Sequence, residues 1–240
     1  MARNEVDSLM RRLQTDKFVM FHTMENPTAP YLVPRSLLAG QSDYFDTRMQ
    51  NNQWMFTFKG DQAEIWKTYL HWLVEKKLRE DIFAIDGTPD LESAAACYAL
   101  GEQYGLKAFQ DEVMLYILHW ADSCDSRGEW LVADGVLVAF QHTSGGSKLR
   151  HLLVEEAVHE QGSNGLPFGM GMDTEEVLKL EDLGFFPLFI NKWAHGDCPD
   201  ESRFGDKCEA EYSWKNYMVG PAEKYEAARL KQAKEAEEET

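Results

Sequence analysis

The sequence has few cysteines and no long apolar run. Four cysteines among 240 residues are too few for the dense disulfide framework of small secreted domains, so free thiols in a reducing compartment are expected. No apolar run approaches the ~20 residues that span a bilayer, and residues 1–16 have no apolar segment typical of a signal peptide. We therefore expect an intracellular protein, cytoplasmic or nuclear, with no membrane partner.

Positive charge is also scarce in this chain. Lysine and arginine number 24 against 41 aspartates and glutamates, which gives a formal net charge of −17 at pH 7. A field of that sign repels phosphate backbones, and basic residues cluster only at Arg11–Arg12 and over residues 76–79. Direct binding of nucleic acid is therefore not expected.

No complete catalytic or nucleotide-binding motif is recognisable. The segment around Gly146 and Lys148 departs from a phosphate-binding loop, because Ser147 separates the glycine from the lysine. The seven histidines are scattered, and none lies in a local catalytic signature. We expect a helix–helix turn here with Ser147 as the N-cap, and a protein that is not an enzyme and needs no cofactor.

One group of residues has ligands suited to a metal. His195, Cys198 and Cys208 carry the imidazole and thiolate groups that zinc prefers. A structural zinc site needs four ligands in close pairs, and Cys208 has no near partner in the sequence. A polar loop with free thiols is the favoured interpretation. The alternative is a zinc-dependent regulator, or a small intracellular enzyme, that uses these three residues.

The apolar residues that are present suffice for a sizeable core, since 44 % of the chain is hydrophobic and seven residues are tryptophan. Their periodicity and the turn residues between them predict an ordered series of elements. These are a hairpin of strands 17–23 and 31–33 joined by a turn over 24–30, a helical stretch over 36–49, a strand over 54–59, a helix over 61–78 begun by Asp61, a short strand over 82–85, and a helical hairpin over 91–104 and 109–120.

The remainder of the chain shows only helical patterns. Helices are predicted over 129–140 and 147–160, then one that begins after Asp173 or Thr174 and one that ends near Trp193. Because strands and helices do not alternate regularly, the pattern predicts an α+β fold. It consists of a small mixed sheet with covering helices, followed by an all-helical C-terminal region.

The segment from Tyr31 to Phe45 reads Y-L-V-P-R-S-L-L-A-G-Q-S-D-Y-F and resembles the core segment of BTB/POZ domains. Phe56 to Phe58 resembles the next strand of that family, and residues 61–78 resemble its following helix. Cys97 to Leu106 is similar to its helical hairpin. The resemblance covers about residues 17–120 and extends weakly to the helical region of fungal single-BTB proteins. Pro34 stands where the family usually has histidine, and residues 17–23 contain no aspartate.

The resemblance implies a domain division and a role. It predicts a BTB/POZ-like domain over residues 1–122, a helical region over 123–220 and an exposed charged tail over 221–240. BTB domains bind themselves or partner proteins, and some are substrate adaptors on the cullin scaffold of ubiquitin ligases. A protein–protein interaction module of this kind is therefore expected here. A purely structural, self-associating protein is the remaining alternative.

A homodimer is expected from the same resemblance, because BTB domains commonly dimerise through an N-terminal helix and strand. Val6, Leu9, Met10 and Leu13 are spaced i, i+3, i+4 and i+7 and predict an apolar helical stripe in front of the first strand. Packing of this stripe on the chain's own body is the alternative. The expected core of residues 17–120 comprises Leu37, Leu38, Tyr44, Phe45, Trp66, Leu70, Leu100 and Tyr104.

Overall fold

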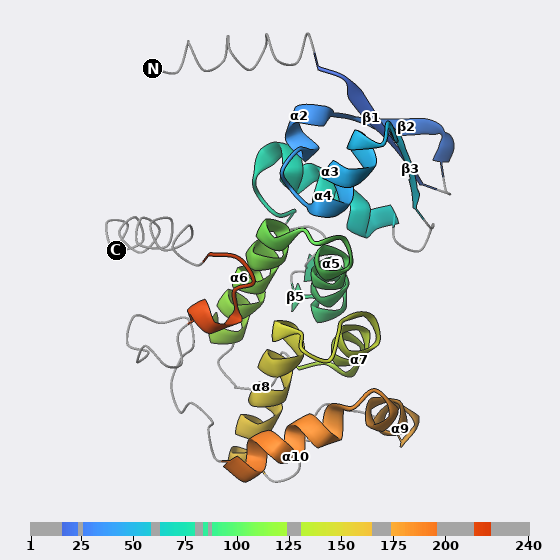
Figure 1. Cartoon of the computed structure of the whole chain (residues 1–240). Coiled ribbons are helices and arrows are strands. Elements are labelled where there is room, and N and C mark those ends of the chain that lie inside the picture. The colour runs from blue at the N-terminus through green and yellow to red at the C-terminus, as the bar shows by residue number, and fades with distance from the viewer. Residues whose placement is uncertain are drawn as a thin grey trace.

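The fold is α+β, as predicted, with a small three-stranded sheet at one end and, elsewhere, mostly helices with a two-stranded sheet (Figure 1). The computed structural model describes residues 16–23, 26–58, 63–79, 84–85, 88–123, 131–164, 174–195 and 214–221. In Figure 1 the sheet and the first helices lie at the top, and the later helices continue downward from them. The later helices therefore extend the molecule away from the sheet and do not only cover the sheet.

The sheet has three strands in the order β2-β1-β3. Strand β1 (Phe18–Thr23) pairs antiparallel with β2 (Asn26–Pro34) and parallel with β3 (Met55–Phe58). The predicted turn over 24–30 was too long, because β2 already begins at Asn26. Prolines are tolerated in β2 because it is an edge strand, where a missing N–H breaks no ladder bond on the free side.

The single helical stretch predicted over 36–49 is two helices instead, α2 (Arg35–Leu38) and α3 (Asp43–Gln50). Gly40 lies between them with φ 76°, in the left-handed region that glycine adopts readily. The Ser42 hydroxyl then accepts a hydrogen bond from the Phe45 amide and caps α3. Gly40 and Ser42 indicate the end of one helix and the start of another, but the prediction of a single helical stretch did not take them into account.

After helix α4 (Ala63–Glu75) come two strands of two residues each, β4 (Ala84–Ile85) and β5 (Thr88–Pro89). Helix α5 (Leu91–Tyr104) follows them. Asp61 lies outside the described residues. The bounds of α5 match the prediction, because the Asp90 carboxylate accepts from the amides of its first turn and Gly105 ends it at φ 66°. Helix α6 (Lys107–Ser123) follows directly.

The later helices are α7 (Ala133–His142), α8 (Lys148–Asn164), α9 (Thr174–Asp182) and α10 (Phe185–His195), followed by the short 3-10 helix η4 (Trp214–Tyr217). Helix α7 packs along α5, α10 packs on α8, and η4 contacts both α6 and α8. Ser147 stands where the N-cap of α8 was predicted, and its carbonyl accepts from the His151 amide. Because α8 begins at Lys148, Ser147 is its N-cap residue, as predicted.

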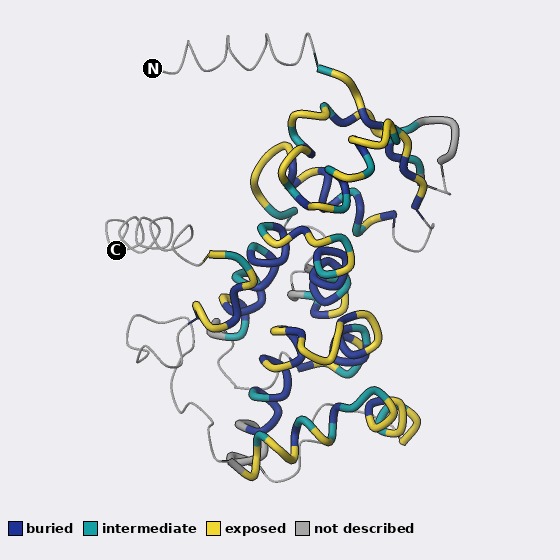
Figure 2. Tube along the Cα trace, viewed as in Figure 1, coloured by how far each residue is buried: buried dark blue, intermediate teal, exposed yellow. Residues whose placement is uncertain are grey.

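The core beneath the sheet is aromatic, and Figure 2 shows the buried trace continuing into α5 and α6. The rings of Phe58 and Trp66 stack with centroids 3.6 Å apart, and Phe45 lies among the rings of its neighbours. The eight predicted core residues are confirmed. Five are buried (Leu38, Phe45, Trp66, Leu70 and Leu100), and three are partly buried against them (Leu37, Tyr44 and Tyr104).

Candidate interaction surface

The sheet carries an apolar outer face on the side away from the core. Strand alternation turns Val19 and Phe21 of β1 inward, where both are buried, and turns Phe18 and Met20 outward. Met20 pairs with Leu32 of β2 on one side and with Met55 of β3 on the other. Residues paired in this way point to the same face. We define the outer face as Phe18, Met20, Leu32 and Met55.

Three of these side chains are largely open to solvent. The exposed fraction is 47 % for Phe18, 58 % for Leu32 and 50 % for Met55, although they lie on adjacent strands. The solvent-facing side of an antiparallel sheet is usually polar, and contiguous exposed apolar side chains mark interaction sites. The outer face is therefore the candidate surface for binding another protein.

The edges of the sheet are less suited to binding than its face. Pro27, Pro30 and Pro34 leave β2 without three of its backbone N–H donors. Strand β3 is only four residues long. Prolines and short strands are common protections against edge-to-edge pairing. Association through added strands is therefore disfavoured, and contact across the face is favoured.

Two cations lie around Trp54 at one end of the sheet. Lys17 Nζ and the Arg35 guanidinium carbon are each 5.4 Å from the centre of the Trp54 ring. The Arg35 amide also donates to the Lys17 carbonyl at 2.8 Å, which ties the start of β1 to the end of β2. Burial works against ionisation of Asp16, but hydrogen bonds from Ser36 and the charge of Arg35 hold its pKa below the usual value.

Most site residues predicted from the sequence lie outside the described residues. This applies to Val6, Leu9, Met10 and Leu13 of the apolar stripe and to Cys198 and Cys208 of the zinc candidates. His195 is the last residue of α10, and its side chain is not described. Within the described part of the chain, no three histidine, cysteine or acidic side chains gather as metal ligands would. The zinc alternative stays a prediction, because its three residues are not among the described side chains.

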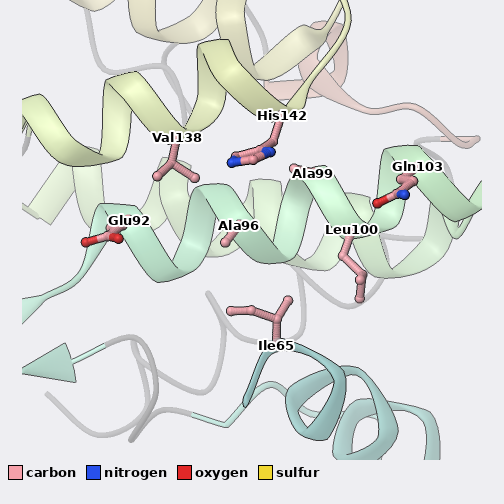
Figure 3. A pocket seen from close by; sticks show the side chains of 8 residues that line it. All are labelled: Ile65, Glu92, Ala96, Ala99, Leu100, Gln103, Val138 and His142. Carbon is pink, nitrogen blue, oxygen red and sulfur yellow. The ribbon is translucent and has the colours of Figure 1, made fainter. Parts of the chain in front are cut away.

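A groove that was not predicted from the sequence lies between α4, α5 and α7 and has a volume of about 210 Å³ (Figure 3). Its floor is a face of α5 with Ala96 and Ala99, and its walls are Ile65 of α4 and Val138 of α7. The only sequence signal was the concentration of alanine in α5. Whether small side chains leave a groove open depends on which helices flank them, and no local pattern reveals that.

One end of this groove is acidic. Glu92 lines it, and burial together with the charges of Asp90 and Asp134 raises the pKa of the Glu92 carboxyl. No ion pair involves any of these three carboxylates within the described residues. His142 and Gln103 line the groove further along. The groove thus combines an apolar floor with an unpaired negative charge.

Comparisons with known protein families, with curated proteins and with solved structures found no match for this chain. Among the helices that the structure describes, none has the length and apolar composition needed to cross a membrane.

Proposed function

We propose that this chain is a protein–protein interaction module of BTB/POZ type, which associates with a second copy of itself and recruits partner proteins. The observation that carries the proposal is the outer face of the sheet, where Phe18, Leu32 and Met55 are exposed together. Such a role requires a surface rather than a catalytic centre. In this proposal the protein is not an enzyme and binds no cofactor.

The element order supports the BTB/POZ resemblance. A hairpin, two short helices, a strand, a long helix and a helical hairpin follow one another, in the order in which the resembling segments occur in the sequence. A substrate adaptor on a cullin scaffold is the narrower form of the proposal. It rests on the resemblance alone.

An energetic estimate shows that the outer face needs help from another segment. Full burial of a Leu, Met or Phe side chain contributes about 1.5–3 kcal/mol, so completing the burial of three half-exposed ones on each of two copies contributes roughly 4–9 kcal/mol. The loss of translational and rotational freedom on association offsets at least about 4 kcal/mol of this. A micromolar complex requires about 8 kcal/mol. The sequence stripe of Val6, Leu9, Met10 and Leu13 shortly precedes β1 and is the natural additional contact.

Light scattering at micromolar concentration tests the proposal. The unaltered chain should give the mass of a dimer, and the double variant Leu32→Ser/Met55→Ser should shift it toward the monomer. Val74→Ser is the matched control, because Val74 is 57 % exposed on α4, away from the outer face. A monomeric unaltered chain, or equal shifts in both variants, would contradict self-association through this face. Co-purification of a cullin from cell extract tests the narrower role.

A further inference from the structure

The groove lies along one face of α5. Glu92, Ala96, Ala99 and Gln103 are spaced by four, three and four residues and so share one face of the helix. At a rise of 1.5 Å per residue this face is about 16 Å long, or three helical turns. Ala96 on this face is partly open, whereas Ala99 is already buried.

The charge around the groove selects the chemistry of its occupant. Glu92 at one end adds to the fields of Asp90 and Asp134, and the chain as a whole carries −17. The walls contributed by Ile65 and Val138 are apolar. A basic side chain beside an apolar stripe complements both features, because attraction between opposite potentials steers binding and apolar burial stabilises it.

We propose that the groove between α4, α5 and α7 binds a basic amphipathic helix of a partner protein, with its apolar stripe against Ala96 and Val138 and a lysine or arginine against Glu92. This proposal rests on the proposed role as an interaction module and assigns that role a second surface. The groove and the outer face of the sheet share no residue. Recruitment through α5 therefore leaves self-association through the sheet unobstructed.

Fluorescence anisotropy with labelled synthetic peptides tests this assignment on the full-length protein. The probe is a 15-residue helical peptide with leucine at positions i, i+3, i+4 and i+7, which form its apolar stripe. At one end of the peptide, the positions that are not leucine are lysine. Its partner probe has glutamate in place of every lysine. The lysine probe should bind at least about tenfold more tightly than the glutamate probe, which corresponds to about 1.4 kcal/mol.

Variants separate the groove from general attraction to an acidic protein. Gln103→Arg places a cation in the groove from an exposed position and should weaken the lysine probe about tenfold. Glu92→Gln should weaken it several-fold, whereas Glu181→Gln removes the same charge from exposed α9 and should change binding less than about twofold. Equal losses in Glu92→Gln and Glu181→Gln would overturn the proposal.

Two further measurements complete the test. Ala96→Phe fills the floor of the groove and should abolish binding of the lysine probe, with the thermal transition recorded to confirm that the variant folds. A probe with the sequence of this chain's own residues 1–15 distinguishes the occupant. If that probe binds the groove as tightly as the lysine probe, the chain binds itself there and the partner assignment is wrong. Leu32→Ser/Met55→Ser should leave probe binding unchanged, so failure of the sheet proposal is seen separately.

Discussion

The sheet end of the molecule and its C-terminal helices are held together by different interactions. Beneath the sheet, Phe21, Phe45, Phe58 and Trp66 form a contiguous aromatic cluster. The C-terminal helices contain apolar core as well, but single buried polar side chains join their ends. A substitution in an apolar core lowers the stability of the fold in proportion to the side-chain volume removed. A substitution of one buried polar side chain removes all of the hydrogen bonds that join the helices there.

Arg150 is the clearest of these junctions. It is buried, yet no carboxylate lies within ion-pair distance of it in the described residues. Its Nε donates to the Thr143 hydroxyl at 3.0 Å, and its terminal nitrogens donate to the carbonyls of Phe140, Thr143 and Leu183. These carbonyls lie at the C-terminal ends of α7 and α9, where the helix dipole favours a cation. One side chain thereby joins α7, α8 and the turn before α10.

Asp111 is the second junction. Its buried carboxylate on α6 accepts from the amides of Val219 at 2.6 Å and Gly220 at 2.9 Å. This attaches the segment that follows η4 to a helix more than a hundred residues earlier. Glu155 of α8 supports the same region, because it accepts from the Tyr217 hydroxyl and pairs with Lys192 at 2.8 Å.

The largest expected effect is in the aromatic core. Phe45→Ala removes a fully buried ring that contacts several others, and we expect a loss of about 3–5 kcal/mol in the free energy of unfolding. Urea denaturation measures it. Leu32→Ser on the opposite side of the same sheet should change that free energy by less than about 0.5 kcal/mol. Similar losses in both variants would contradict the assignment of the two faces.

Arg150→Met comes next, with an expected loss of about 2–4 kcal/mol, because it leaves buried carbonyls without donors. Arg150→Lys should recover only part of this loss, since an ammonium cannot reach three carbonyls as the planar guanidinium does. Calorimetry on the two variants and on the exposed control Lys148→Met checks the order. A fully stable Arg150→Lys would show that charge alone suffices.

Asp111→Asn should have a smaller and more local effect. The amide keeps the size of the side chain but accepts more weakly and brings an NH2 group toward the two backbone donors, so we expect a loss of about 1–2 kcal/mol. Native-state hydrogen exchange should show faster exchange of the Val219 and Gly220 amides and unchanged protection in β1. Uniform loss of protection would mean that the two regions unfold as one unit.

Glu92→Gln should stabilise the protein slightly at neutral pH, by no more than about 0.5 kcal/mol. Burial and the neighbouring charges of Asp90 and Asp134 raise the pKa of Glu92 in the folded state, so its ionised form disfavours folding. The advantage of glutamine should shrink as the pH falls through the folded pKa and vanish below the unfolded pKa of about 4.3. Paired unfolding curves of the two proteins, recorded from well below about pH 4.3 up to neutral pH, would measure it. A stabilising effect that persists at low pH would point to another cause.

The smallest effect is expected at the C-terminus. A chain that ends at Pro221 keeps the contacts of Asp111 with Val219 and Gly220, and the residues removed include only Tyr225 and Leu230 as large apolar side chains. Its melting temperature should therefore stay within about 2 °C of the full chain, since few buried contacts are lost. A drop of many degrees would show that the segment after Pro221 packs on the body.

Local signals explain where the sequence analysis succeeded. The bounds of α5 were predictable because Asp90 and Gly105 act on neighbouring residues only. The strand β3 was predictable because the alternation over residues 54–59 is a local pattern. The division into α2 and α3 was predictable in principle from Gly40 and Ser42, and the prediction erred by following the apolar spacing instead.

The candidate surfaces were only partly predictable. Leu32 lay in the segment that carries the family resemblance, but nothing in that segment indicated that its side chain faces solvent. Exposure of the outer face follows from the pairing of Met20 with both Leu32 and Met55, which joins strands from three parts of the chain. The groove along α5 was missed for a similar reason, because its walls come from α4 and α7.

The sequence by itself determined the α+β class, most of the elements and the burial of Phe45 and Trp66, because hydrophobic periodicity and caps act over a few residues. Tertiary structure alone decided the parallel pairing of β3 with β1, the role of Arg150 at the helix ends and the apolar outer face of the sheet. Each of these depends on groups far apart in the sequence. Their energies exist only once the chain has brought those groups together.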